Sequence, residues 1–221
     1  MTRVLNSGRR EPVSGSLRSA VVFVHGYGAN GADLLGLADV LGEHLPDTLF
    51  VAPDAPEELP GMPGGYQWFP IPWLDGSSEE EAARGMAAAE EDLNAFLDGL
   101  MVDNDLLPEQ VVLFGFSQGT MMSLQVAPRR DDPILGIVAF SGRLLNPELL
   151  ADDVVSRMPV LLVHGDADDV VPPQSLPQAA EALQQAGFKE VFAHVMKGTG
   201  HGIAPDGLGV ALAFMRDKLS L

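Results

Sequence analysis

The chain contains no cysteine, and this absence removes several chemistries at once. With none among 221 residues, disulfides, a thiolate nucleophile and cysteine-ligated zinc are all excluded. Apolar runs as long as a membrane span, about 18 residues, are also missing. Residues 1–19 are polar and lack the apolar centre of a signal peptide. We therefore expect a cytoplasmic protein without stable membrane insertion.

Positive charge is scarce as well. The 13 Lys and Arg residues against 31 Asp and Glu residues give a formal net charge of −18. Nucleic acid and acidic membrane surfaces are repelled by such a charge, so we expect neither as a partner. With 46% hydrophobic and 20% charged residues, the composition is that of a soluble globular domain. The length fits one domain, 1–221, with a substantial core.

Short apolar runs alternate with amphipathic segments along the chain. The predicted strands are Ala20–Val24, Leu49–Ala52, Val111–Phe114, Ile134–Phe140, Val160–Val163 and Val191–Met196. Helical spacing is found in 34–45, in 82–100 behind the capping pattern Ser78…Glu81, in 175–187 and in 208–219. This alternation predicts an α/β fold, with a mostly parallel sheet covered by helices on both faces. The segment 1–19 is a candidate for an additional edge strand.

The loop 60–76 interrupts this alternation of predicted strands and helices. It is too rich in Pro and Gly for a regular element, yet it holds both tryptophans, Trp68 and Trp73. Such a loop is either a surface element pinned to the core or a wall of a binding site. The loop's own residues do not decide between the two.

A serine stands in the turn after the Val111–Phe114 strand. Gly115, Ser117 and Gly119 match the G-x-S-x-G pattern of a nucleophile elbow, in which a strained turn raises a serine hydroxyl above the sheet edge. The pattern occurs by chance often enough that it needs support from elsewhere in the sequence.

Two interpretations fit the glycine-rich loop 25–31 after the first predicted strand. Gly26, Gly28 and Gly31 satisfy the dinucleotide fingerprint G-x-G-x-x-G, with Asp54 as the acid for a ribose. Alternatively, the small residues let a backbone N–H point into a cleft as an oxyanion donor.

Two further loops carry titratable side chains after strands. Asp166, Asp168 and Asp169 follow the fifth predicted strand, and they suggest either a calcium loop, for which further oxygen ligands are missing, or turn and helix caps. His201 lies between glycines after the last strand, where it has little to pack against.

Taken together, these loops favour one chemistry. Ligands bind outside the carboxyl ends of parallel strands, and Ser117, Asp168 and His201 all follow strands, in the chain order of α/β-hydrolases. A serine hydroxyl needs an imidazole to take its proton, and the imidazole needs a carboxylate to hold its tautomer. The dinucleotide interpretation leaves the serine turn and the histidine unexplained.

With these motifs, the chain resembles the phospholipase/carboxylesterase family of small α/β-hydrolases, whose relatives include acyl-protein thioesterases. The resemblance rests on HGYGANGADL (25–34), GFSQGT (115–120), HGDADDVVP (164–172) and GTGHGI (198–203). It implies Ser117 as nucleophile, Asp168 as acid and His201 as base, with the backbone N–H groups of Tyr27 and Gln118 as oxyanion donors. It also implies that neither a cofactor nor a metal takes part.

Departures from the thioesterase branch narrow the expected activity. That branch typically has Leu and an acidic residue where this chain has Tyr27 and Asn30, and a Gly where it has Thr120. The motifs look closer to bacterial carboxylesterases. We therefore expect a serine carboxylesterase that forms an acyl-enzyme on small-molecule esters. The alternatives are a lysophospholipase or thioesterase, and a catalytically silent binding protein of the same fold.

The substrate pocket is expected beside the long loop. We predict an apolar wall made by Met62, Trp68, Phe69 and Trp73, faced by Leu144 and Leu145. The other loops are too short for a large lid domain, so we expect short to medium acyl chains. The sequence leaves open whether the chain forms a homodimer.

Overall fold

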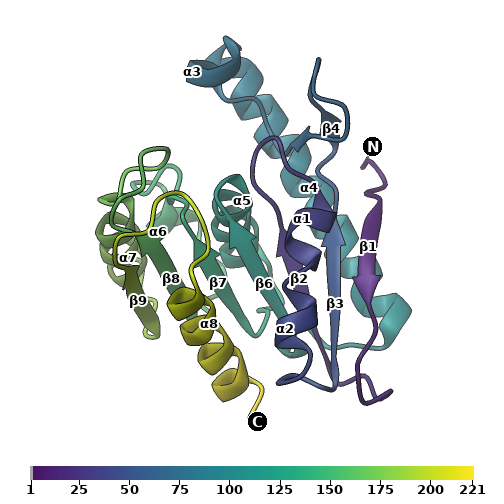
Figure 1. Ribbon diagram of the computed structural model, residues 1–221. Helices are drawn as coiled ribbons and strands as arrows, with labels where there is room; N and C mark the ends of the chain where they lie inside the picture. Colours follow the sequence, from purple (N-terminus) through teal and green to yellow (C-terminus); the bar gives the residue numbers. More distant parts are fainter. Residues whose placement is uncertain (1) are drawn as a thin grey trace.

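The computed structural model describes residues 2–221, which fold around a seven-stranded sheet (Figure 1). The strand order is β1-β3-β2-β6-β7-β8-β9, and every neighbouring pair is parallel except β1 with β3. The strands are β1 Ser7–Arg10, β2 Ser19–Val24, β3 Thr48–Pro53, β6 Val111–Phe116, β7 Gly136–Phe140, β8 Val160–Gly165 and β9 Val191–Met196. A separate antiparallel ribbon pairs β4 Glu57–Glu58 with β5 Tyr66–Gln67. The predicted mostly parallel sheet is confirmed, and β1 lies at its edge.

Helices fill the connections between the strands. They are α1 Gly31–Leu35, α2 Ala38–Leu41, α3 Pro72–Asp75, α4 Glu79–Asn104, α5 Gln118–Val126, α6 Leu150–Asp153, α7 Ser175–Gln185 and α8 Pro205–Lys218, with 3₁₀ turns at Pro108–Gln110 and Ala127–Arg129. The capping box predicted for α4 is present, since Ser78 Oγ accepts the Glu81 N–H and Glu81 Oε2 accepts the Ser78 N–H. The helical pattern over 34–45 is divided into α1 and α2 at Gly36, whose low helix propensity favours a break.

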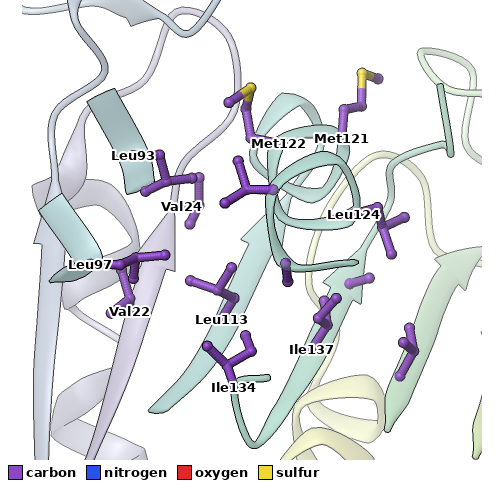
Figure 2. Close-up of a cluster of buried hydrophobic side chains, with 14 of the residues drawn as sticks. Val22, Val24, Leu93, Leu97, Leu113, Met121, Met122, Leu124, Ile134 and Ile137 are labelled. Atoms are coloured by element: carbon purple, nitrogen blue, oxygen red, sulfur yellow. The ribbon is translucent and has the colours of Figure 1, made fainter. Parts of the chain in front are cut away.

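The central strands are buried on both faces, as the apolar runs predicted. In β2, Val22 and Val24 belong to one core cluster, and Val21 and Phe23 to the other. Figure 2 shows the first cluster, in which α4 and α5 lie over β2, β6 and β7. On the opposite face, α1, α2 and α8 cover the second cluster (Figure 1). Successive side chains of a strand point to opposite faces, so each strand contributes to both layers.

The parallel topology gathers the loops that matter at one edge. Strands β2, β3, β6, β7, β8 and β9 all end on the same side of the sheet (Figure 1). Open parallel sheets bind ligands at this edge. Among residues 2–221, no helix is long and apolar enough to cross a membrane.

Candidate active site

The turn between β6 and α5 is strained at Ser117. This residue has φ 54° and ψ −115°, a backbone conformation that residues other than glycine rarely adopt. A Cβ on Gly115 would lie 2.6 Å from the carbonyl oxygen of Gly119, and one on Gly119 would lie 1.8 Å from that of Val24. Both glycines are therefore required by the close approach of β6, α5 and β2. The turn has the geometry that the G-x-S-x-G pattern predicts for an elbow.

Three side chains from three loops form a continuous hydrogen-bonded chain. Ser117 Oγ lies 3.0 Å from His201 Nε2, and His201 Nδ1 lies 2.8 Å from Asp168 Oδ2. Ser117 is 9% exposed and Asp168 is 5% exposed. The imidazole stays partly open to solvent, with 17% of its side chain exposed. A substrate can therefore reach the serine and the imidazole, whereas the carboxylate is shielded.

The environment of Asp168 keeps its carboxyl group ionised. Burial acts to raise the pKa of Asp168, but hydrogen bonds from His201 and from the amides of Val170 and Val171 outweigh it, and the pKa lies below its ordinary value. An ionised carboxylate only accepts hydrogen bonds, so His201 carries its proton on Nδ1. The lone pair of Nε2 then faces Ser117 Oγ, as proton transfer from the hydroxyl requires.

The neighbouring acids of Asp168 have other partners. Asp166 accepts the N–H of Gly198 at 2.6 Å and pairs with Lys197 at 3.2 Å, while Asp169 is exposed. No group of three or more potential metal ligands gathers in the described part of the chain. The calcium interpretation of this acidic run therefore has no support in the structure, and only Asp168 reaches His201.

Two backbone amides have no acceptor among the described residues, one in the helix start that follows the serine and one in the loop that packs against it. A Cβ on Gly26 would be 3.2 Å from Ser117 Cβ, so the loop after β2 lies against the elbow. Gln118 is the first residue of α5, where helical N–H groups have no intrahelical acceptor. Within residues 2–221, no hydrogen bond from the N–H of Tyr27 or Gln118 is formed. These are the two amides predicted as oxyanion donors.

The dinucleotide interpretation of the same loop is wrong. Asp54 Oδ1 accepts the N–H of Gly31 at 2.9 Å, so this acid anchors the start of α1 instead of facing a ribose. A Cβ on Gly31 would lie 2.2 Å from the Ala52 carbonyl oxygen. Asn30 caps α1 through its side chain. The glycine spacing therefore serves helix packing and the approach to Ser117.

Trp68 corrects the expectation for the long loop. It is fully buried, and its indole N–H donates to the carbonyl of His25 at 3.0 Å. The side chain of Gln118 completes this anchor, because its Oε1 accepts the N–H of Trp68 at 2.9 Å and its Nε2 donates to the carbonyl of Phe69 at 2.7 Å. Trp68 therefore pins the loop to the core, and its assignment to the pocket wall is wrong.

The other predicted pocket residues do not form a single wall. Phe69, Trp73 and Leu145 line a cavity of about 190 Å³, together with Met86 and Met121; we call it the aromatic cavity. Met62 lines a cavity of about 670 Å³ beside Tyr27. Leu144 and Leu145 line a cavity of about 480 Å³ between the loop 143–148 and α7; we call it the loop cavity. The pocket prediction was too simple, because α3 and the loop after β7 divide the space.

Three supporting contacts escaped the sequence analysis. The ring of Phe116 packs on the imidazole of His201, with centroids 5.0 Å apart. His164 Nε2 lies 2.9 Å from the carbonyl oxygen of Val171 and 3.2 Å from Asp168 Oδ2. Thr120 Oγ1 donates toward the carbonyls at the ends of β6 and β7. All three residues lie inside the quoted motifs, but their contacts depend on which strands are neighbours.

Comparison with known proteins agrees with this geometry. A family model described as phospholipase/carboxylesterase matches residues 11–219. Acyl-protein thioesterase 1 of Saccharomyces cerevisiae is 31% identical over 221 residues, which cover 92% of this chain and 94% of that protein. Acyl-protein thioesterase 1 of Gibberella zeae is 29% identical over 237 residues, with 97% and 98% covered. The crystal structure of esterase PE8 superimposes with a TM-score of 0.91 at 41% identity, with 97% of this chain and 99% of that chain covered.

The matched region includes every strand from β2 to β9 and all three loops of the hydrogen-bonded chain. The resemblance noted in the motifs is thus confirmed over nearly the whole length. The chain belongs to the phospholipase/carboxylesterase family of α/β-hydrolases, and it is a serine hydrolase.

Proposed function

We propose that the protein is a carboxylesterase that hydrolyses esters of short to medium acyl chains through an acyl-enzyme on Ser117. The observation that carries the proposal is the hydrogen-bonded chain from Ser117 through His201 to the buried Asp168. A hydroxyl, a base and an orienting carboxylate within hydrogen-bond reach are the parts that nucleophilic acyl transfer needs.

Each step of the reaction has a group in place. His201 Nε2 takes the proton of Ser117 as Oγ attacks the ester carbonyl carbon, and the amides of Tyr27 and Gln118 donate to the developing oxyanion. The protonated imidazole then gives its proton to the departing alcohol oxygen, which leaves the acyl-enzyme. Water attacks the acyl group with His201 again as base, so that the carboxylic acid leaves and Ser117 Oγ recovers its proton. Asp168 stabilises the imidazolium in both halves.

The aromatic cavity supports the preference for short to medium acyl chains. Met121, which lines it, lies one helical turn after Ser117. Its volume of about 190 Å³ accommodates roughly six groups of ~30 Å³, the share of a water molecule in the liquid. Each buried CH₂ contributes about 0.8 kcal/mol of binding. Chains that outgrow the cavity gain nothing further from it.

A thioesterase or lysophospholipase activity is the second candidate. The relatives from Saccharomyces cerevisiae and Gibberella zeae both bear the name acyl-protein thioesterase 1. In addition, Trp73 and Leu74 are 69% and 59% exposed beside the aromatic cavity. An exposed apolar rim of this kind suits a longer acyl chain lying along the surface.

The test combines active-site labelling with a substrate panel. A fluorophosphonate probe is expected to label the wild type and not Ser117→Ala. Nitrophenyl esters of acetate, butyrate, octanoate and palmitate are then compared with the thioesters of the same acids. We expect the highest kcat/KM for butyrate or octanoate oxygen esters. Preference for palmitoyl thioesters would establish the second candidate, and a chain that is neither labelled nor active would be a binding protein.

A further inference from the structure

Arg143 is a cation without a carboxylate partner in a strongly acidic chain. Ion pairs to Asp or Glu within 4 Å are formed by Arg3, Arg9, Arg10, Arg18, Arg84, Arg129 and Arg130. Arg143 belongs to none of the pairs found in 2–221, and its buried Nε has no hydrogen-bond partner there. Its guanidinium lies 4.8 Å from the centroid of the Trp73 ring, a cation–π contact that leaves its hydrogen-bond donors unused.

The position of Arg143 connects it to the acyl site. It follows Gly142, where a Cβ would lie 2.8 Å from the carbonyl oxygen of Ser117, so this loop touches the backbone of the elbow. Arg143 lines both the aromatic cavity and the loop cavity. Arg143, Leu145 and Asn146 are common to the two cavities, so an acyl chain on Ser117 that enters the aromatic cavity would meet the guanidinium where the cavities adjoin.

The far wall of the loop cavity supplies further donors. Ser175 lines it, is only 7% exposed, and its Oγ forms no hydrogen bond within the described residues. Ser175 is the first residue of α7, whose positive dipole end favours a negative charge. The amide side chain of Gln178 lies on the same wall. The loop 166–174, which carries Asp168, leads directly into this helix, so the cavity lies between the loop after β7 and the start of a helix that follows the active-site acid.

Acidic side chains around Arg143 are few and exposed. Glu148 lines the loop cavity and Glu79 lines the aromatic cavity, and neither is within 4 Å of the guanidinium. The guanidinium of Arg143, the hydroxyl of Ser175 and the amide of Gln178 thus form a local donor set in a protein of charge −18. Arginine and hydroxyl donors around a cavity match the acceptor oxygens of a carboxylate.

We propose that Arg143 and Ser175 form a subsite for a carboxylate at the end of the acyl chain, so that the enzyme accepts half-esters of dicarboxylic acids. This inference rests on the proposed esterase function and names a substrate class for it. The reaction is the same acyl transfer: the ester bond breaks at Ser117, the alcohol leaves, and the distal carboxylate is bound without reacting.

The first arm of the test compares two esters of nearly equal shape. Monomethyl adipate carries a carboxylate, and methyl 6-methylheptanoate carries an isopropyl group in its place; methanol release measures both. Arg143→Leu is expected to lower kcat/KM for monomethyl adipate roughly tenfold or more, the effect of losing a charged hydrogen bond. The kcat/KM for the neutral ester should fall several-fold less than that for the half-ester, because its isopropyl end offers no acceptor to the guanidinium. Monomethyl esters from succinate to sebacate locate the best chain length.

Two matched variants sharpen this arm. Arg143→Lys keeps the charge and is expected to retain part of the preference for the half-ester. Glu148→Gln removes the acid of the loop cavity and should raise kcat/KM for the half-ester alone. Equal losses on both esters in Arg143→Leu would show that Arg143 only packs on Trp73, and the subsite would be disproved.

The second arm measures binding without turnover. Calorimetric titration of monomethyl adipate into Ser117→Ala should show binding that is lost in Ser117→Ala/Arg143→Leu and weakened in Ser117→Ala/Ser175→Ala. Binding of the half-ester by a wild type that hydrolyses no ester would overturn the esterase function and keep the subsite. Hydrolysis of neutral esters without binding or turnover of any half-ester would overturn the subsite and keep the esterase.

Discussion

The elbow around Ser117 and the loop 60–76 face the same sheet edge but are built in opposite ways. At the elbow, the side chains of Ser117 and Asp168 are buried and hydrogen-bonded, and glycines permit contacts that no side chain would allow. In the loop, Met62 and Trp73 are largely exposed, whereas Trp68, Phe69 and Ile71 are held in the core. Chemistry that tolerates little displacement is placed on strand ends and a helix start, whereas substrate contacts are placed on a loop.

The largest effect is expected at the centre of the elbow. Ser117→Ala should lower kcat by about 10⁶-fold if the three side chains act as a unit. Removing one hydroxyl also relieves no part of the strained turn, so thermal stability should stay close to that of the wild type. Kinetics with a good ester substrate and thermal unfolding of the same preparation measure the two. Retention of a tenth of the activity would show that another residue is the nucleophile.

The next largest effect is expected at the acid that is hydrogen-bonded to His201. Asp168→Asn should reduce kcat about 10⁴-fold, because an amide can hold His201 in the wrong tautomer. Asp166→Asn is the matched control: its carboxylate binds Gly198 and Lys197 at the surface, so its loss should cost little activity. If the control were the inactive variant, the assignment of His201's partner would be wrong.

Trp68 and Trp73 lie in the same loop, one buried and one exposed, so replacing each of them tests the contrast between buried and exposed positions. Trp68→Ala should lower the free energy of unfolding by about 3–5 kcal/mol, the usual cost of emptying a buried aromatic site. Trp73→Ala should leave stability nearly unchanged, because its side chain is 69% exposed. Instead, it should raise KM for octanoate esters more than for acetate esters. Denaturant unfolding and steady-state kinetics separate the two outcomes, and equal behaviour of both variants would contradict the contrast.

Two glycine substitutions compare the close packing at the elbow with an exposed position in an ordinary helix. A Cβ on Gly119 meets the backbone of β2, so Gly119→Ala should destabilise the protein by about 3 kcal/mol or more. Gly99 lies in the exposed part of α4 with no atom near an added Cβ. Gly99→Ala should therefore stabilise by about 0.5–1 kcal/mol through helix propensity. Denaturant midpoints measure both, and a tolerated Gly119→Ala would mean that α5 is free to shift.

The smallest effect is a pH dependence of stability from the loop after β2. Burial lowers the pKa of His25, although its hydrogen bond to the Gly26 carbonyl opposes this. The unfolded chain therefore takes up a proton on His25 below about pH 6.5 while the folded chain does not. The free energy of unfolding should fall as the pH drops below that value, by at most about 1.4 kcal/mol per unit.

Unfolding at about pH 7.5 and about pH 5.5 measures this loss, with His44→Asn as control because His44 is exposed. A His25→Asn variant should lose less stability on acidification than the wild type or the control. The depressed pKa of Asp168 contributes in a lower window, since its stabilisation is lost only as the pH falls below about 4. An identical loss in all three proteins would rule out His25 as the source.

The sequence predicted those parts of the molecule that depend on residues close to one another in the chain. Alternating apolar runs predicted the parallel sheet, and the serine, aspartate and histidine could be selected because each follows a strand. The burial of Trp68 could not be predicted, since it depends on His25 and Gln118, which are 43 and 50 positions away in the chain. The division of the pocket is also non-local, because it arises where α3 meets the loop after β7. The break at Gly36 was missed because the apolar spacing continues through it.

The bridge from the Gln118 side chain to Trp68 and Phe69 has a consequence for redesign. One residue supplies an amide beside the nucleophile and also fixes the backbone at the base of the variable loop. Loops of other lengths can therefore be grafted after position 69 without disturbing the reaction centre, whereas a graft that begins earlier removes the brace of α5. Changes after position 69 can therefore alter the substrate range without altering the catalytic rate, whereas changes before it alter both together.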